Sequence, residues 1–366
     1  MPRRRLRSPS RPTRHTTNSN NVDALDRQLV HALFLDGRLP FSRVAEVLGV
    51  SDQTIARRYQ RLHDAGALQV LGRLDPGRLG QVEWMVRLQC APRAAMAVAE
   101  ALAKRQDTHW VRLASGGTEV VCTVQADSEQ SRDALLLDKL PATRSVRAIS
   151  AHCLLHVFRG GQSTWPGVTS ALTPQQSAEI RATDQQYSPS PESDPEALDK
   201  NDHALLAELA RDGRATYAAL AAATGRHEAA IRRRIAQLRS SGVLYFDVDI
   251  DNRLLGYHST ALLWITVEPS QLTAVGEALA GHRETAFAAA TTGRTNLLAS
   301  VVAADVHALY RYLAEELGRL PILEIETAPI LRTVKRAGAG NPASGHARSA
   351  PQRASAPPIP QMATTE

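Results

Sequence analysis

An arginine-rich segment with the pattern of a helix occurs twice in the chain. It reads SDQTIARRYQRLHDAGAL over residues 51–68 and HEAAIRRRIAQLRSSGVL over residues 227–244, a constant offset of 176 positions. In the first copy Ile55, Tyr59 and Leu62 recur at helical spacing, which places them on one buried face. The arginines must then lie on the remaining surface. An exposed helix face with guanidinium groups can bind phosphates and guanine edges, so the sequence predicts contact with DNA.

The first copy carries polar groups at the positions that can read bases. Early positions of a recognition helix enter the major groove, where glutamine and threonine can hydrogen-bond base edges and arginine can bind guanine or phosphate. Ser51 is a favourable N-cap for this helix. The DNA-binding residues predicted in this copy are Ser51, Gln53, Thr54, Arg57, Arg58 and Arg61.

The second copy differs from the first where bases would be read. Ala229 and Ala230 replace the Gln-Thr pair, and His227 replaces the serine cap. Alanine can touch a thymine methyl group but cannot donate or accept a hydrogen bond. The DNA-binding residues predicted here are Arg232, Arg233, Arg234 and Arg239. We expect this copy to hold the DNA backbone strongly and read sequence weakly, or to read a different half-site.

Two shorter helical patterns precede each arginine-rich helix and must position it. Leu25, Leu29 and Leu33 fall on one face of a helix that ends at Asp36-Gly37, and a second short helix stops at Gly49. Three helices with a glycine turn between the second and third predict a helix-turn-helix. GALQVLGRLD and GVLYFDVDID follow the two copies with alternating strand character, as a small wing or a lead into a sheet.

The rest of each copy reads β-α-β-β-α-β, the order of a ferredoxin-like sandwich. We therefore expect an α+β fold, with two tandem copies of a winged helix-turn-helix followed by a ferredoxin-like α/β sandwich. The expected folded domains are the helix-turn-helix domains 21–74 and 198–250 and the ferredoxin-like domains 80–160 and 256–337. The remaining segments are a disordered basic tail 1–20, a linker 161–197 that reads as unfolded apart from a short helix capped by Thr173, and a disordered tail 338–366.

Composition narrows the possible functions. The net charge is +6, but residues 1–20 alone hold six arginines and no acid, so the folded part is close to neutral. No apolar run reaches the roughly 20 residues of a transmembrane helix, so we expect no membrane partner. Three cysteines without metal-ligand spacing indicate a reducing cytoplasm. Without a nucleophile triad, metal spacing or phosphate loop, we expect no catalytic residue, metal or cofactor, and no enzyme.

The two copies together resemble the Lrp/AsnC family of transcriptional regulators. The resemblance rests on LDKNDHALLAELARDGR with its looser copy VDALDRQLVHALFLDGR, on the helix-turn-helix that follows, and on the ferredoxin-like end LPILEIETAPILRTVK. It implies a sequence-specific regulator that binds double-stranded DNA, self-associates through its ferredoxin-like domains and responds to a small effector such as an amino acid. Here two units are fused, so one chain would supply both recognition helices for a two-fold-like operator.

The resemblance also implies where an effector would bind. The family's pocket is lined partly by a Gly-x-x-Asp-like turn, which here reads Gly116-Gly117-Thr118-Glu119 and Gly293-Arg294-Thr295-Asn296. The implied effector residues are Gly116, Glu119, Gly293 and Asn296. Glu119 can pair with an ammonium group, whereas Asn296 can only hydrogen-bond to it. The alternative is that both glycine turns serve a β-hairpin and hold no ligand.

Two other functions remain open at this point. One is a DNA-architectural or co-regulator protein with little sequence preference. The other is a tetrapyrrole decarboxylase-like enzyme, because haem-precursor decarboxylases use a similar two-domain fold. Such an enzyme would need converging histidines and arginines. His109, His152 and His156 lie in or beside predicted strands, but their counterparts in the second copy are not histidines.

Overall fold

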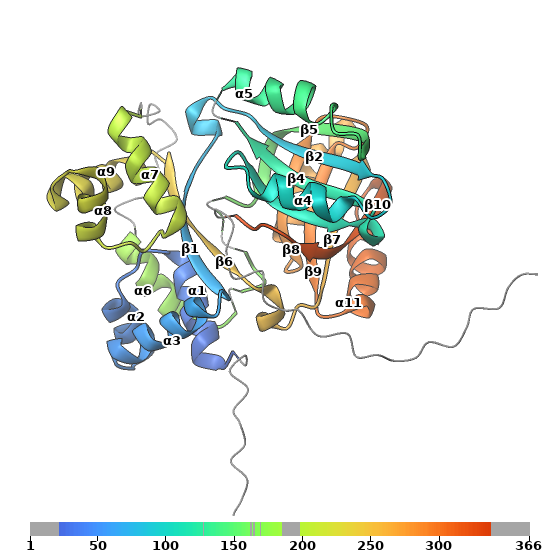
Figure 1. Ribbon diagram of the computed structural model, residues 1–366. Helices are drawn as coiled ribbons and strands as arrows, with labels where there is room; N and C mark the ends of the chain where they lie inside the picture. Colours follow the sequence, from blue (N-terminus) through green and yellow to red (C-terminus); the bar gives the residue numbers. More distant parts are fainter. Residues whose placement is uncertain are drawn as a thin grey trace, which may run out of the picture.

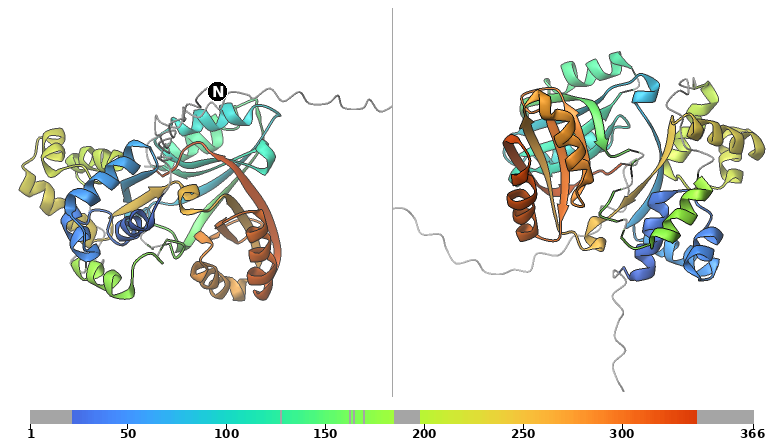
Figure 2. Two further views of the ribbon diagram at one scale, coloured as in Figure 1. Left: turned by 90° about the horizontal axis from the view of Figure 1, so that it is seen from below. Right: turned by 180° about the vertical axis from the view of Figure 1, so that it is seen from behind.

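The computed structural model describes residues 22–126, 128–161, 163, 165–168, 170–184 and 198–337 (Figure 1). The expected tails 1–20 and 338–366, and residues 185–197 of the expected linker, lie outside the described residues. Helical units occupy one side of the molecule and a strand-rich body the other, with a ribbon of two strands between them (Figures 1 and 2). The expected mixed α and β fold with two helix-turn-helix units is confirmed.

Each DNA-binding unit consists of three helices. The first unit contains α1 (Ala24–Leu35), α2 (Phe41–Leu48) and α3 (Asp52–Asp64), and the second contains α7 (Lys200–Arg211), α8 (Tyr217–Thr224) and α9 (Glu228–Ser240). Gly49 ends α2 at φ 66°, a left-handed conformation that glycine adopts without strain. Ser51 then caps α3, because its side chain accepts a hydrogen bond from the Thr54 amide. The turn that presents α3 thus follows from these two residues.

The two expected wings form a single ribbon. β1 (Leu68–Leu74) pairs antiparallel with β6 (Leu244–Ile250) from the other copy, from Leu68 opposite Ile250 to Leu74 opposite Leu244. The ribbon packs closely on the helices beside it. A Cβ atom on Gly72 of β1 would lie 2.7 Å from the Cβ atom of Leu209 on α7, so only glycine fits there. One strand from each copy therefore joins the two DNA-binding units.

Each ferredoxin-like unit has the expected β-α-β-β-α-β order. The first contains β2 (Glu83–Cys90), α4 (Ala95–Ala103), β3 (Thr108–Ala114), β4 (Glu119–Gln125), α5 (Glu129–Asp133) and β5 (Val146–Arg159). The second contains β7 (Ser259–Val267), α10 (Leu272–Gly281), β8 (Thr285–Thr291), β9 (Leu297–Ala303), α11 (Val306–Arg311) and β10 (Ile322–Thr333). A stretch of π-helix follows both α5 and α11.

Eight strands of the described chain close into one barrel in the order β10-β3-β4-β2-β5-β8-β9-β7. The last strand of each unit crosses to the other unit. β5 pairs first with β2 and then, from Leu154, with β8. β10 pairs first with β7 and then, from Ile330, with β3. Apolar residues of both units, among them Met85 and Trp264, share one buried cluster, so the two units complete a common core.

The start of the linker is packed, contrary to its expected unfolded state. The expected short helix is α6 (Pro174–Asp184), with the Gln176 amide donating to Thr173 Oγ1 at 3.2 Å. Trp165, Leu172 and Ile180 are buried in the core of the first DNA-binding unit. The polar composition of the segment concealed these few apolar side chains. α6 packs against α1 and α2, whereas Trp165 packs against Tyr257.

Candidate DNA interface

The exposed face of α3 presents two of the predicted base-reading groups. Gln53 and Arg57 are exposed, and neither side chain has a hydrogen bond or ion pair with another described residue. Ser51 and Thr54 are engaged with each other, because their hydroxyl oxygens lie 2.8 Å apart and Ser51 Oγ accepts from the Thr54 amide at 3.2 Å. Gln53 and Arg57 are therefore the groups best placed to reach outward, while Ser51 and Thr54 fix the start of the helix.

Arg58 of α3 pairs with two carboxylates at the start of α1. Its Nη1 lies 2.7 Å from Asp23 Oδ2 and 2.8 Å from Asp26 Oδ1. Arg61 Nη2 lies 2.5 Å from the other oxygen of the Asp26 carboxylate, which is fully buried. A buried carboxylate requires such partners, and these pairs tie α3 to α1. The DNA contact of Arg58 stays a prediction, for a side chain that is also paired within the protein. Arg61 keeps 43% of its side chain exposed.

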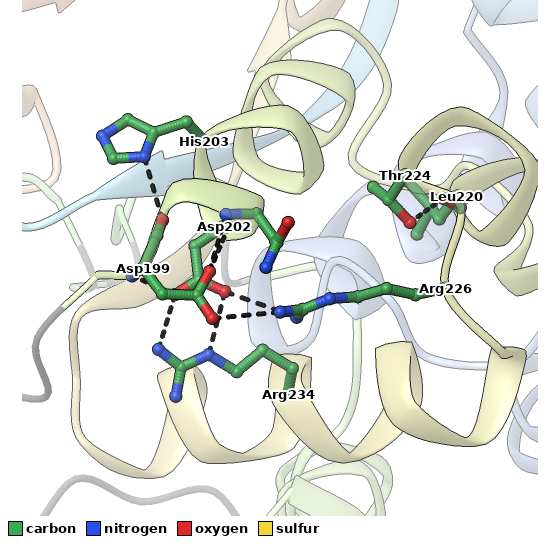
Figure 3. A network of polar contacts seen from close by, with 8 residues as sticks. Asp199, Asp202, His203, Leu220, Thr224, Arg226 and Arg234 are labelled. Carbon is green, nitrogen blue, oxygen red and sulfur yellow. Dashed lines mark hydrogen bonds and ion pairs between the residues drawn. The ribbon is translucent and has the colours of Figure 1, made fainter.

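The second unit repeats this ion pair. Arg234 donates to Asp202 through Nε at 3.0 Å and Nη2 at 2.6 Å, and Asp202 is fully buried (Figure 3). Arg226 adds a contact of 3.0 Å to Asp199. Arg234 and Asp202 correspond to Arg58 and Asp26 at the 176-residue offset, so both copies pair this arginine within the protein, and the DNA contact of Arg234 stays a prediction. The sequence contained a signal for this role, because Asp-x-x-Asp capping boxes begin both first helices.

Arg239 also binds within the protein. Its Nη2 lies 3.2 Å from Asp36 Oδ1 of the first unit, and only 13% of the side chain is exposed. The guanidinium carbon lies 5.5 Å from the centre of the Phe246 ring. Arg239 therefore links the two DNA-binding units, and its phosphate contact stays a prediction.

Two predicted arginines remain on the surface of α9. Arg233 is exposed and has no hydrogen bond or ion pair with the described part of the chain. Arg232 is exposed too, with its guanidinium carbon 4.5 Å from the centre of the Tyr217 ring. Ala229 and Ala230 precede them on the same helix. The α9 surface thus offers positive charge without the amide and hydroxyl groups of α3.

The sequence reading missed a pair of arginines that orient the two units. Arg38 donates to the carbonyl oxygens of Gly213 and Ala215 at 2.7 and 3.0 Å. Arg214 donates in return to those of Gly37 and Leu39 at 2.6 and 3.0 Å. Burial lowers the pKa of both guanidinium groups. The available signal was the repeated Asp-Gly-Arg, which we read only as a helix end.

The predicted effector residues are occupied within the fold. Glu119 is 3% exposed and accepts from Arg87 Nε at 2.6 Å and from Ser115 Oγ at 2.9 Å. The Asn296 amide accepts from Val267 N at 3.0 Å and donates to Val267 O at 2.8 Å. Glu119 and Asn296 therefore have partners within the fold, and their contacts with an ammonium group stay predictions.

The glycines of these two turns serve the backbone. Gly116 has φ 72° and Gly293 has φ 113°. A Cβ atom on Gly293 would lie 2.5 Å from His152 Nδ1. The geometry of both turns agrees with the alternative of hairpin turns that hold no ligand.

The described residues hold neither a metal cluster nor a membrane-spanning helix. They contain no group of three or more histidine, cysteine or acidic side chains that could hold a metal ion. Within the same residues no helix is long and apolar enough to cross a membrane. Cys90 and Cys122 are buried, as expected for core thiols, and burial raises the pKa of Cys122 to about 12, whereas Cys153 is only half-buried.

Two helix-turn-helix units with exposed arginines, carried on ferredoxin-like domains, define a DNA-binding transcriptional regulator. The family model of the AsnC-type helix-turn-helix domain matches residues 22–63 and 198–239, and the Lrp/AsnC ligand binding domain matches residues 260–339. The chain belongs to the Lrp/AsnC family of regulators.

Relatives with related sequences align with about a third of the chain. The HTH-type transcriptional regulator FL11 of Pyrococcus horikoshii is 30% identical over 140 residues, which are 38% of this chain and 92% of that protein. The regulator Rv2324 of Mycobacterium tuberculosis is 32% identical over 117 residues, or 31% of this chain and 77% of that protein. Each relative thus corresponds to roughly one of the two copies.

The expectation that the chain is not an enzyme needs correction. A crystal structure of the siroheme decarboxylase NirDL matches 86% of this chain and 93% of its own, with a TM-score of 0.55 and 14% identity. A known enzyme therefore has a fold similar to nearly the whole chain. Because this fold can carry an enzyme, the absence of a catalytic motif in the sequence does not exclude catalysis. At this identity the likeness concerns the fold alone.

The three histidines considered for such an enzyme have separate partners. His109 Nδ1 lies 3.0 Å from Arg73 Nη1, and burial together with Arg73 and Lys335 lowers its pKa to about 2. His152 Nδ1 lies 2.7 Å from the Thr292 carbonyl oxygen. His156 packs edge-on against Phe158 with ring centres 4.6 Å apart. Each ring is thus engaged at a different place in the fold.

Proposed function

We propose that this chain is a sequence-specific regulator in which one polypeptide, as a fused pseudo-dimer, presents two recognition helices to double-stranded DNA. The observation that carries the proposal is the pair of reciprocal hydrogen-bond sets made by Arg38 and Arg214, here called the arginine clamp. Each arginine donates to backbone carbonyls of the other helix-turn-helix unit, so the two units are related symmetrically. The β1–β6 ribbon and the exchange of β5 and β10 support it, because each joins corresponding elements of the two copies. The unit for DNA recognition is then a single chain.

The two helices have different tasks in this proposal. Gln53 and Arg57 on α3 read base edges, and Arg61 adds a phosphate contact. Arg232 and Arg233 on α9 hold phosphates without reading the sequence closely. The operator is accordingly asymmetric, with one half-site of defined sequence and one of relaxed sequence at a fixed spacing.

The proposal extends to self-association and location. Apolar side chains remain exposed on the ferredoxin-like units, including Leu155 on β5, Tyr310 on α11 and Leu323 and Leu331 on β10. They support association of chains through these units, as the family suggests. Double-stranded DNA as the partner, and cysteines of which none is in a disulfide, support a cytoplasmic protein.

Salt-dependent binding tests specificity against the architectural alternative. Binding of intact protein to its selected operator and to random DNA is measured by fluorescence anisotropy at several salt concentrations. A regulator binds the operator at least 10³-fold more tightly than random DNA at physiological salt. Equal affinities with parallel salt slopes would instead support a protein that binds phosphates without reading bases.

The likeness to NirDL over nearly the whole chain favours a second candidate function, an enzyme acting on a tetrapyrrole. The test is to incubate the purified chain with siroheme and follow loss of carboxyl groups by mass spectrometry. Decarboxylation that disappears in a His109→Ala variant would support this candidate. Unchanged siroheme alongside operator binding would leave the regulator as the function.

A further inference from the structure

A hollow of about 50 Å³ opens where three parts of the molecule meet. Arg27 and Val30 line it from α1 of the first DNA-binding unit, and Tyr257 and Arg283 line it from the second ferredoxin-like unit. The remaining wall is formed by Leu255 and, before α6, by Gly167, Val168, Ser170 and Ala171. This volume suits one small charged group rather than a drug-sized ligand, whose pockets span about 300–1,000 Å³. The hollow lies apart from the glycine turns considered above.

The charges around this hollow are one-sided. Its lining residues include Arg27 and Arg283 and no acidic side chain. Both arginines are exposed, and the guanidinium of Arg283 has no hydrogen bond or ion pair with another described residue. Arg27 donates from Nη1 to the Leu255 carbonyl oxygen at 3.1 Å. Two guanidinium groups from separate domains, without a counter-charge in the lining, suit a small anion.

The walls of the hollow are held by specific contacts. Tyr257 donates its hydroxyl hydrogen to the Gly167 carbonyl oxygen at 3.0 Å. Trp165 Nε1 donates to the Arg283 carbonyl oxygen at 2.9 Å, and the Trp165 and Tyr257 ring centres lie 5.2 Å apart. Behind the wall, the Leu172 amide donates to His31 Nδ1 at 3.0 Å. The site is therefore built from fixed side chains rather than from a loop alone.

The hollow is also connected to the recognition helix of the first unit. Arg27 follows Asp26, the buried carboxylate that binds Arg58 and Arg61 of α3. A ligand held by Arg27 and Arg283 would fasten α1 to the second ferredoxin-like unit. The position corresponding to Arg27 in the second copy is His203. The two copies therefore differ at this position.

We propose that this hollow binds a small anionic molecule, a carboxylate or a phosphate compound, and that its occupation fixes the first DNA-binding unit relative to the barrel. Binding itself is independent of the proposed regulatory function, whereas its effect on operator affinity rests on that function. The hollow supplies an effector site different from the turns that the family resemblance implied.

Titration of the intact protein tests the binding. Trp165 fluorescence is followed as succinate, inorganic phosphate or uncharged succinamide is added at constant ionic strength, with a Trp165→Phe variant to identify the signal. The expected result is a saturable change with succinate or phosphate and no change with succinamide. Succinate alone would identify carboxylates as the ligand class, and phosphate alone would identify phosphates. Linear, equal responses to all three probes would overturn the proposal.

Matched variants locate the site. Arg27→Gln and Arg283→Gln are each expected to weaken binding of the active probe at least 10-fold. Arg253→Gln is the control, because Arg253 is exposed and pairs with Asp251 in the same domain outside the lining. Equal binding by all three variants would contradict this location. Circular dichroism confirms that each variant is folded.

A second arm separates this inference from the proposed regulatory function. Operator affinity is measured with and without the active probe. A change in affinity that Arg283→Gln abolishes supports both the site and its coupling to α3. Saturable probe binding by a protein without operator preference would leave the site standing and contradict the regulator. Operator binding without any probe binding would contradict the site alone.

Discussion

Arg38 and Arg214 hold the two DNA-binding units together by reciprocal hydrogen bonds. Each guanidinium donates two bonds to backbone carbonyl oxygens of the other unit, and each packs over an aromatic ring there, Arg38 on Tyr217 at 4.9 Å and Arg214 on Phe41 at 4.1 Å. Tyr217 and Phe41 are also equivalent positions in the two copies. The relation between α3 and α9 is therefore fixed in part by two arginines whose guanidinium groups are bound within the protein.

Loss of one clamp arginine should destabilise the fold. Hydrogen bonds to charged groups contribute about 1.5–3 kcal/mol, so Arg38→Ala should lower the free energy of unfolding by at least that amount. Urea denaturation measures the change, with Arg57→Ala as an exposed control expected to stay within about 0.5 kcal/mol of the original protein. Equal stability of the two variants would show that the clamp is not stabilising.

Arg57 and Arg58 are neighbours in sequence, but we expect their replacement by alanine to have different effects on stability and on DNA binding. Arg58→Ala leaves the buried Asp26 with Arg61 as its remaining cation and should cost about 3 kcal/mol of stability, the low end for breaking a buried pair. Arg57→Ala should leave stability unchanged and weaken operator binding by about 1–3 kcal/mol. Denaturation and anisotropy on both variants check this division. A stability loss for Arg57→Ala with none for Arg58→Ala would reverse the assignment.

Replacing polar groups on the two helices should affect DNA binding differently. Gln53→Ala should broaden the selected half-site while changing affinity for random DNA little, because Gln53 is assigned to bases. Arg233→Ala should weaken operator and random DNA alike and reduce the salt slope by about one unit, as expected for one lost phosphate contact. Unchanged base preferences in the Gln53→Ala variant would show that Gln53 does not contact bases.

His31 predicts a pH dependence of stability. Burial and Arg181 lower its pKa to about 4, below the ordinary value of 6.5, so the folded state favours the neutral ring that accepts from Leu172. The unfolded chain binds the proton more readily, and the contribution, present above pH 6.5, is lost as the pH falls towards 4. Relative to His31→Gln, the original protein should lose about 2 kcal/mol between pH 7 and pH 4.5. Parallel stability curves for the two proteins would contradict this role.

The sequence predicted the elements better than the partners of their side chains. Duplication, the Ser51 cap and the order of strands and helices depend on local patterns and are visible in the chain. Three arginines of the third helices instead pair with buried or nearly buried carboxylates elsewhere in the fold. The pairs are Arg58 with Asp26, Arg234 with Asp202, and Arg239 with Asp36. Each pair depends on the distance between its arginine and its carboxylate in the folded chain. That distance is set by packing, so surface periodicity alone made all these arginines look equivalent.

The sequence also did not show which strands of the two copies pair with each other. An alternating strand such as β1 shows that a partner is needed but not which strand provides it. The same limit applies to β5 and β10, whose second halves cross to the other unit. Trp165 and Ile180 show it for the linker, where a few apolar residues are sufficient for burial once other elements of the fold offer a surface.

Selection from a random double-stranded DNA library tests most directly whether one chain uses two recognition helices. Intact protein is compared with a variant carrying Arg232→Ala and Arg233→Ala, which spares the structural Arg234. We predict that intact protein enriches a two-part motif of fixed spacing and that the variant enriches only the part read by α3. Enrichment of the same short motif by both proteins would contradict a role for α9 in DNA binding.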